Sequence, residues 1–202
     1  YERERLKAVD LAEYMTLTLR KVLQLVFNAG SHGAIEVITR PSNDKELAFK
    51  LKSSDSPFAL IRIGNTAEWL KNYLVDYEVV KGFTDESFFE QINRDDSTVN
   101  LLMGSRSFYE GWDSNRPNVI TYINIGVGAD SKKFILQSVG RGVRIEPLKG
   151  KRRRMLNLRN AGAVSEATYR LAQDYLDAVE SLFIFGTNRS ALASVLDELE
   201  QA

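Results

Sequence analysis

One predicted helix carries the side chains with the clearest capacity for chemistry. Four polar or glycine positions spaced i, i+3, i+4 and i+7 share one of its faces: Gln137, Gly140, Arg141 and Arg144. A guanidinium presents planar N–H donors that match phosphate oxygens. A glycine inside a helix costs about 1 kcal/mol relative to alanine, so Gly140 and Gly142 indicate a need for close approach. The pattern predicts a polyphosphate-binding face; the alternative is a solvated face whose arginines pair with acids.

A second candidate lies in the loop between residues 104 and 118, after a predicted strand. Its polar and turn-forming residues include Ser105, Arg106, Gly111 and Asp113. A hydroxyl at the end of a strand can donate to a phosphate, and a glycine beside an acid permits a tight turn. Trp112 fits either base stacking or core packing, and packing is the commoner role of a tryptophan.

Positive charge is concentrated between residues 132 and 159. This segment holds ten Lys or Arg residues and one acid, Glu146, in a chain whose 27 basic and 27 acidic residues balance to a formal net charge of +0. Five of the ten cations lie between Lys149 and Arg154, in a run that matches no motif. The run is either a solvated loop or a strip that faces the phosphates of a nucleotide or of DNA.

Composition excludes several other kinds of site. The chain has no cysteine and a single histidine, His32, so thiol chemistry, disulfides and a histidine-based metal site are not expected. No apolar stretch approaches the roughly 18 to 20 residues of a membrane span, and the first residues do not resemble a signal peptide. We therefore expect a cytoplasmic protein with no membrane partner and no resident metal ligands.

The alternation of elements predicts an α/β fold with three layers, in which helices cover both faces of a mostly parallel sheet. Apolar runs indicate strands near residues 35–39, 58–63, 77–80, 99–103, 119–125 and 181–185. Helices are predicted to open at a capping box over Asn43 to Glu46, at Thr66 and at Asp85, and to span 132–143, 164–179 and 191–199. In such sheets ligands bind at the C-terminal ends of the strands, where both candidate segments fall.

The first 33 residues are predicted to be a helical lead-in or an interdomain connector, and residues 34–202 a single domain. The chain starts without methionine and inside a helical pattern that runs to Gly30. We expect it to be part of a longer protein.

In order and spacing, these segments resemble motifs V and VI of the superfamily 2 helicases and translocases. The resemblance rests on Glu110-Gly111-Trp112-Asp113, on Gln137-x-x-Gly140-Arg141-Gly142-x-Arg144, and on the closing run from Leu182 to Asn188. It covers roughly residues 58 to 200. Within the superfamily the chain is most similar to the restriction (Res) subunits of type III restriction-modification systems.

This resemblance implies that residues 34–202 are the second RecA-like domain, of the P-loop NTPase type, of a DNA motor. By position, Arg144 matches the arginine finger that stabilises the γ-phosphate, and Arg141 matches the arginine that contacts the same phosphates. Gln137 matches the residue that orients this helix, and Gly140 belongs to the same nucleotide-binding motif.

The second motif carries over in the same way. Gly111 and Asp113 match positions that touch the nucleotide and couple it to DNA, and Ser105 and Arg106 fall where the family grips the DNA backbone. The chain has no Gly-x-x-x-x-Gly-Lys-Ser/Thr loop. ATP and Mg²⁺ would therefore be held mainly by the first RecA-like domain of the same polypeptide.

The partners implied are DNA, that first domain and a methyltransferase subunit. Two alternatives remain open: a DNA repair or remodelling translocase, and a non-catalytic RecA-like scaffold that binds DNA or docks a protein.

Overall fold

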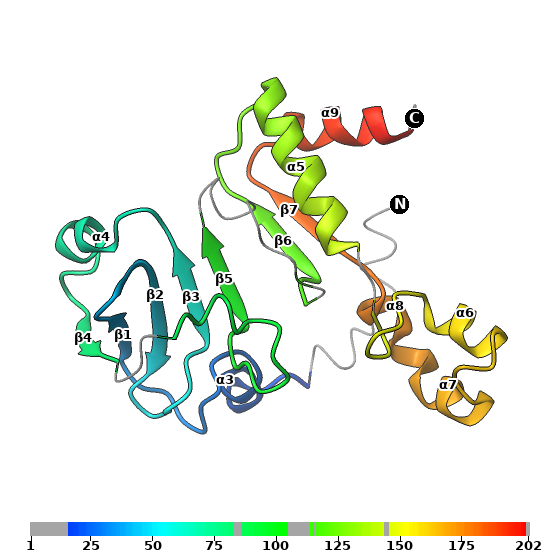
Figure 1. Cartoon of the computed structure of the whole chain (residues 1–202), viewed down its shortest axis with the longest axis horizontal. Coiled ribbons are helices and arrows are strands. Elements are labelled where there is room, and N and C mark those ends of the chain that lie inside the picture. Colours follow the sequence, from blue (N-terminus) through cyan, green and yellow to red (C-terminus); the bar gives the residue numbers. More distant parts are fainter. Residues whose placement is uncertain (1–15, 83–85, 105–113, 115, 144–145, 201–202) are drawn as a thin grey trace. The chain divides into compact units, whose positions relative to one another are not determined.

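The structure is a computed structural model that describes residues 16–82, 86–104, 114, 116–143 and 146–200 (Figure 1). The chain divides into two compact units, residues 1–110 and 111–202. No helix among the described residues is both long and apolar enough to cross a membrane.

The first unit is built on a five-stranded sheet in the order β4-β1-β2-β3-β5. The strands are β1 (Ile35–Arg40), β2 (Asn43–Leu51), β3 (Ala59–Arg62), β4 (Glu78–Lys81) and β5 (Leu101–Gly104). The β1–β2 and β2–β3 pairs are antiparallel, whereas β1–β4 and β3–β5 are parallel. All four strands predicted in this part of the sequence are present, and β2 is an additional one.

Strand β2 replaces a helix that the sequence predicted to start at a capping box over Asn43 to Glu46. That prediction is wrong. Asn43 instead accepts a hydrogen bond from the amide of Lys45, two residues on, and pairs with Arg40 across the two-residue turn between β1 and β2. Pairing with strands on both sides, and burial of Leu47 at 1% exposure, outweigh the local preference for a helix.

Of the other two helix predictions of this unit, one needs a small change and the other is wrong for the described residues. Helix α4 (Thr66–Asn72) is capped by Asn65, whose side chain accepts from the Glu68 amide at 3.2 Å, so Thr66 is its first residue rather than its cap. The helix predicted to open at Asp85 is not formed by the residues described after it, because residues 88–96 make turns. Asp85 itself lies outside the described residues.

Helix α3 (Leu19–Val26) is joined to the first unit by side-chain hydrogen bonds. The side-chain amide of Asn100, next to β5, donates to the carbonyls of Leu25 and Val26 at 3.1 and 3.0 Å. Asn28, with φ of 53°, donates to the carbonyl of Thr98 at 2.8 Å. The assignment of residues 1–33 as a lead-in stays a prediction, and residues 1–15 lie outside the described part.

The second unit contains one parallel strand pair, β6 (Val119–Tyr122) and β7 (Phe183–Gly186). Helices α5 (Ala129–Gly142) and α9 (Arg189–Glu200), which follow these strands in the sequence, contact each other and share a core with the pair (Figure 1). The buried residues of this core are Tyr122, Ile135, Ala191 and Val195. Both strands and both helices were predicted within a few residues of these bounds.

Between α5 and β7 lie four short helical segments. They are α6 (Met155–Asn160), α7 (Glu166–Ala172), the 3₁₀ turn η2 (Gln173–Tyr175) and α8 (Leu176–Val179). The single helix predicted over 164–179 is thus interrupted, and α6 was not predicted. Counting both sheets, three of the five described strand pairings are parallel, so the chain is α/β as predicted. The RecA-like identity stays a prediction.

Candidate functional site

Helix α5 starts after a loop that is fixed to the loop following β7. The amide of Asn124, whose φ is 54°, donates to the Thr187 hydroxyl at 2.9 Å, and the Thr187 amide donates to the carbonyl of Tyr122 at 3.0 Å. The side chain of Asn188 donates to the carbonyl of Ile125 at 2.9 Å. These bonds tie the carboxyl ends of the two parallel strands together at the edge where α/β sheets bind ligands.

The inner face of α5 is held by apolar packing and one buried hydroxyl pair. Ile135 is 2% exposed, and the rings of Phe134 and Tyr122 meet edge to face with centroids 5.9 Å apart. The Tyr122 hydroxyl is hydrogen-bonded to Ser138 Oγ, which also donates to the carbonyl of Phe134 at 2.8 Å. Burial raises the pKa of Tyr122, and the bond to Ser138 opposes that rise. These contacts fix the rotation of α5 about its axis.

The outer face of α5 points away from this core. Lys133, Gln137 and Gly140 are all exposed, at spacings that put them in one row along the helix. The face predicted to carry the polyphosphate site is therefore available to a ligand at Gln137 and Gly140.

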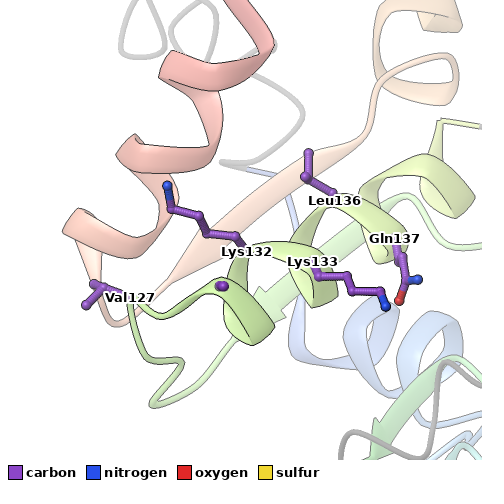
Figure 2. Close-up of a pocket in the computed structure, with 6 residues that line it drawn as sticks. Val127, Lys132, Lys133, Leu136 and Gln137 are labelled. Atoms are coloured by element: carbon purple, nitrogen blue, oxygen red, sulfur yellow. The ribbon is translucent and has the colours of Figure 1, made fainter.

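A hollow of about 670 Å³ adjoins the first turns of α5. Six residues line it: Val127, Ala129, Lys132, Lys133, Leu136 and Gln137. Figure 2 shows the ammonium group of Lys133 and the amide of Gln137 on the same side of the helix, with Lys132 extending the other way. The ammonium group of Lys133 gives this side of the hollow a positive charge, and the Gln137 amide, which can donate, lies beside it.

A negative charge at the start of α5 affects where an anion can bind beside this helix. Asp130 is exposed in the first turn of α5, where its carboxylate counteracts the positive end of the helix dipole. An anion is therefore favoured beside Lys133 and Gln137 rather than at the N-terminal amides of α5.

The two glycines of the motif have different surroundings. Gly142 faces the side chain of Leu182, just before β7, and a Cβ atom there would force the end of that side chain to move. A Cβ atom at Gly140 would meet nothing within 4 Å. Packing accounts for Gly142, whereas Gly140 exposes helix backbone on the same face as Gln137, and no side chain among the described residues requires a glycine there.

Much of the predicted site lies outside the described residues. Arg144 is among them, as are Ser105, Arg106, Gly111 and Asp113, and the side chain of Arg141 is also not described. The structure therefore brings together Gln137 and Gly140 and leaves the remaining assignments as predictions. Lys133 was not singled out from the sequence, although it precedes Gln137 by four residues, the spacing of helix neighbours.

Within the described ranges, no group of three or more His, Asp or Glu side chains could hold a metal ion. No protein-family model matches the chain, and no curated protein or solved structure is significantly similar to it.

Proposed function

We propose that this chain is the second RecA-like motor domain of an ATP-dependent superfamily 2 DNA translocase, of the kind found in type III restriction subunits. The observation that carries the proposal is the outer face of α5. Gln137 and Gly140 are exposed there, Gly140 has open space above it, and a positively rimmed hollow adjoins the same face. Arg141 and Arg144 follow in the sequence at the spacing of a phosphate-binding helix.

In this proposal ATP lies between this domain and the first RecA-like domain, which supplies most of the contacts to ATP and Mg²⁺. The residues here fit the polyphosphate part: Gln137 offers an amide donor, Lys133 a positive charge, and Gly140 close approach to the backbone. Arg144 stabilises negative charge that develops on the γ-phosphate during hydrolysis, and Arg141 holds the same phosphate group. A residue of this kind contributes about 10³ to 10⁵ in rate in related enzymes.

The DNA contacts are assigned to residues 105–113, which follow β5 in the sequence. Ser105 and Arg106 bind backbone phosphates, which fixes position without reading sequence. Gly111 and Asp113 connect this segment to the nucleotide. Opening and closing of the cleft would then move DNA past the protein, in the cytoplasm and with a methyltransferase as partner subunit.

The test is the rate of ATP hydrolysis by the intact protein with and without DNA. Arg144→Ala and Arg141→Ala should each abolish DNA-stimulated hydrolysis while leaving the thermal unfolding midpoint unchanged. Arg170→Ala is the matched control, because Arg170 is an exposed arginine of α7 bonded to Glu166 at 3.0 Å. Near-normal turnover in Arg144→Ala or Arg141→Ala would contradict the proposal.

One observation favours a second candidate, the non-catalytic scaffold. The antiparallel β1–β2 hairpin departs from the mostly parallel sheet expected of a motor domain. A scaffold would bind DNA or a protein with no hydrolysis in the intact protein. If hydrolysis is present, a nuclease activity and a bound methyltransferase separate a restriction subunit from a repair or remodelling translocase.

A further inference from the structure

A tight, highly basic turn follows α5 and precedes α6. Leu148 and Lys151 pair across it as an antiparallel bridge, with the Lys151 amide donating to the Leu148 carbonyl at 2.8 Å. Gly150 has a φ of +74°, a left-handed conformation that favours glycine. We call residues 149–154 the basic turn. The bridge and the left-handed glycine define the backbone conformation of this turn, and so they set the positions from which its side chains extend.

Two acidic residues hold this backbone in place. Glu146 accepts a hydrogen bond from the Gly150 amide and lies 3.9 Å from the guanidinium of Arg152. Glu180, which is 8% exposed, accepts from the amide of Met155 at 2.6 Å, at the point where the basic turn ends and α6 begins. Both carboxylates bind backbone N–H groups, so they anchor the turn as well as offsetting part of its charge.

The side chains of the basic turn face solvent. All five cations in this six-residue run are exposed: Lys149, Lys151, Arg152, Arg153 and Arg154. Like charges at this density repel one another, and a polyanion that replaces small counterions relieves that repulsion. Arginine forms three of the five cations, and guanidinium binds phosphate in a two-pronged geometry that ammonium lacks.

We propose that the basic turn binds the phosphate backbone of duplex DNA, as a contact separate from those assigned to residues 105–113 and to the outer face of α5. The choice of DNA rests on the proposed function. An anionic membrane fits less well, because residues 149–154 contain no aromatic or large apolar side chain to enter the bilayer interface. The contact would be independent of base sequence.

The test measures duplex binding by the intact protein, without ATP, over a range of salt concentrations. The variant Lys151→Gln/Arg153→Gln/Arg154→Gln removes three charges and leaves the Glu146–Arg152 pair intact. Arg154 makes no side-chain bond at the start of α6, so its replacement keeps that helix end. If each side chain neutralises one phosphate, the slope of log affinity against log salt should become shallower by about 2.7.

Two control variants separate this effect from loss of charge or of structure. Lys45→Gln/Lys71→Gln/Lys81→Gln removes the same charge from exposed lysines of the first unit and should keep the wild-type slope. Lys151→Arg/Arg153→Lys/Arg154→Lys retains the charge of the turn and should also keep it. An equal loss of slope in the first-unit control would show that net charge alone matters and would overturn the proposal.

The remaining outcomes distinguish this inference from the proposed function. If the glutamine variant keeps the wild-type salt slope and DNA-stimulated ATP hydrolysis is intact, the basic-turn contact is overturned and the proposed motor function is not. Loss of slope in a protein that hydrolyses no ATP supports the contact and overturns the motor. A third outcome is that the glutamine variant loses binding to anionic phospholipid vesicles and keeps wild-type binding to duplex DNA. That result would show that the basic turn binds a membrane surface and would overturn the DNA contact.

Discussion

The side chain of Leu182 lies against the α-carbon of Gly142. A Cβ atom added at Gly142 would be 2.6 Å from Cδ1 and 2.7 Å from Cδ2 of Leu182, closer than unbonded carbon atoms approach. Leu182 immediately precedes β7, so this contact lets the end of α5 sit close to the chain entering that strand. At Gly140, two residues earlier, a Cβ atom would have open space.

This difference predicts opposite effects of two identical substitutions. Gly142→Ala should destabilise the protein by about 1 kcal/mol net, because moving the end of Leu182 costs up to about 3 kcal/mol and the helix preference for alanine returns only about 1 kcal/mol. Gly140→Ala should instead stabilise the helix by up to about 1 kcal/mol. In the motor proposed here it should also slow ATP hydrolysis, since the added methyl group obstructs the ligand. Denaturant unfolding and ATPase rates measure the two effects.

The role of Leu182 can be isolated with a double-mutant cycle. In a Leu182→Ala background the clash is absent, so Gly142→Ala should no longer be destabilising. The same loss in both backgrounds would mean that helix geometry, rather than Leu182, requires the glycine.

The buried carboxylate of Glu46 makes a second prediction. It lies 3.6 Å from Arg40 and accepts hydrogen bonds from the Ser87 hydroxyl at 2.8 Å and the Phe88 amide at 2.9 Å. Glu46→Ala should cost about 3 to 5 kcal/mol, because it removes one member of a buried ion pair and the acceptor of the bonds from Ser87 and Phe88. Urea unfolding monitored by circular dichroism measures the loss.

The matched control is Glu78→Ala, which removes an exposed carboxylate paired with Lys52 at 3.0 Å. Exposed pairs contribute little, so this variant should unfold close to the wild type. Similar losses in the two variants would show that the burial of Glu46 does not set its importance.

Glu46 also shows why one element could not be predicted from the sequence. The spacing of Asn43 and Glu46 fits a capping box, in which both side chains bind N–H groups of their own helix. In the structure the N–H donors for Glu46 come from Phe88 and Phe89, over forty residues later, and Arg40 lies beside it. Nothing within the local pattern reports partners that distant, whereas each of the six predicted strands was recognised from an apolar run of a few consecutive residues.

The candidate site was predictable to a similar extent. Helical spacing alone placed Gln137 and Gly140 on one face, and the exposure of both agrees with it. Spacing could not separate Gly140 from Gly142, because the distinction depends on Leu182, which is forty residues from Gly142 in the sequence. Lys133 was overlooked because it lies outside the motif, although the same helical period connects it to Gln137.

The pKa of Tyr122 gives a prediction about stability at high pH. Burial raises this pKa above the ordinary value of 10.0, and the hydrogen bond with Ser138 opposes the rise. The folded state therefore holds the phenol proton more tightly than the unfolded state does. The resulting stabilisation is fully present below pH 10.0 and is lost as the pH rises through the folded-state pKa.

Tyr122→Phe tests this linkage because it removes the ionisable hydroxyl and keeps the ring against Phe134. At neutral pH the variant should lose about 1 kcal/mol with its hydrogen bond to Ser138. Above pH 10.0 its stability should fall less steeply than that of the wild type, so the gap between the two proteins should narrow. Tyr73→Phe, at a tyrosine that is 67% exposed, should keep the wild-type profile in denaturant unfolding across this range. A constant gap between Tyr122→Phe and the wild type from neutral to alkaline pH would exclude Tyr122 as a source of alkaline instability.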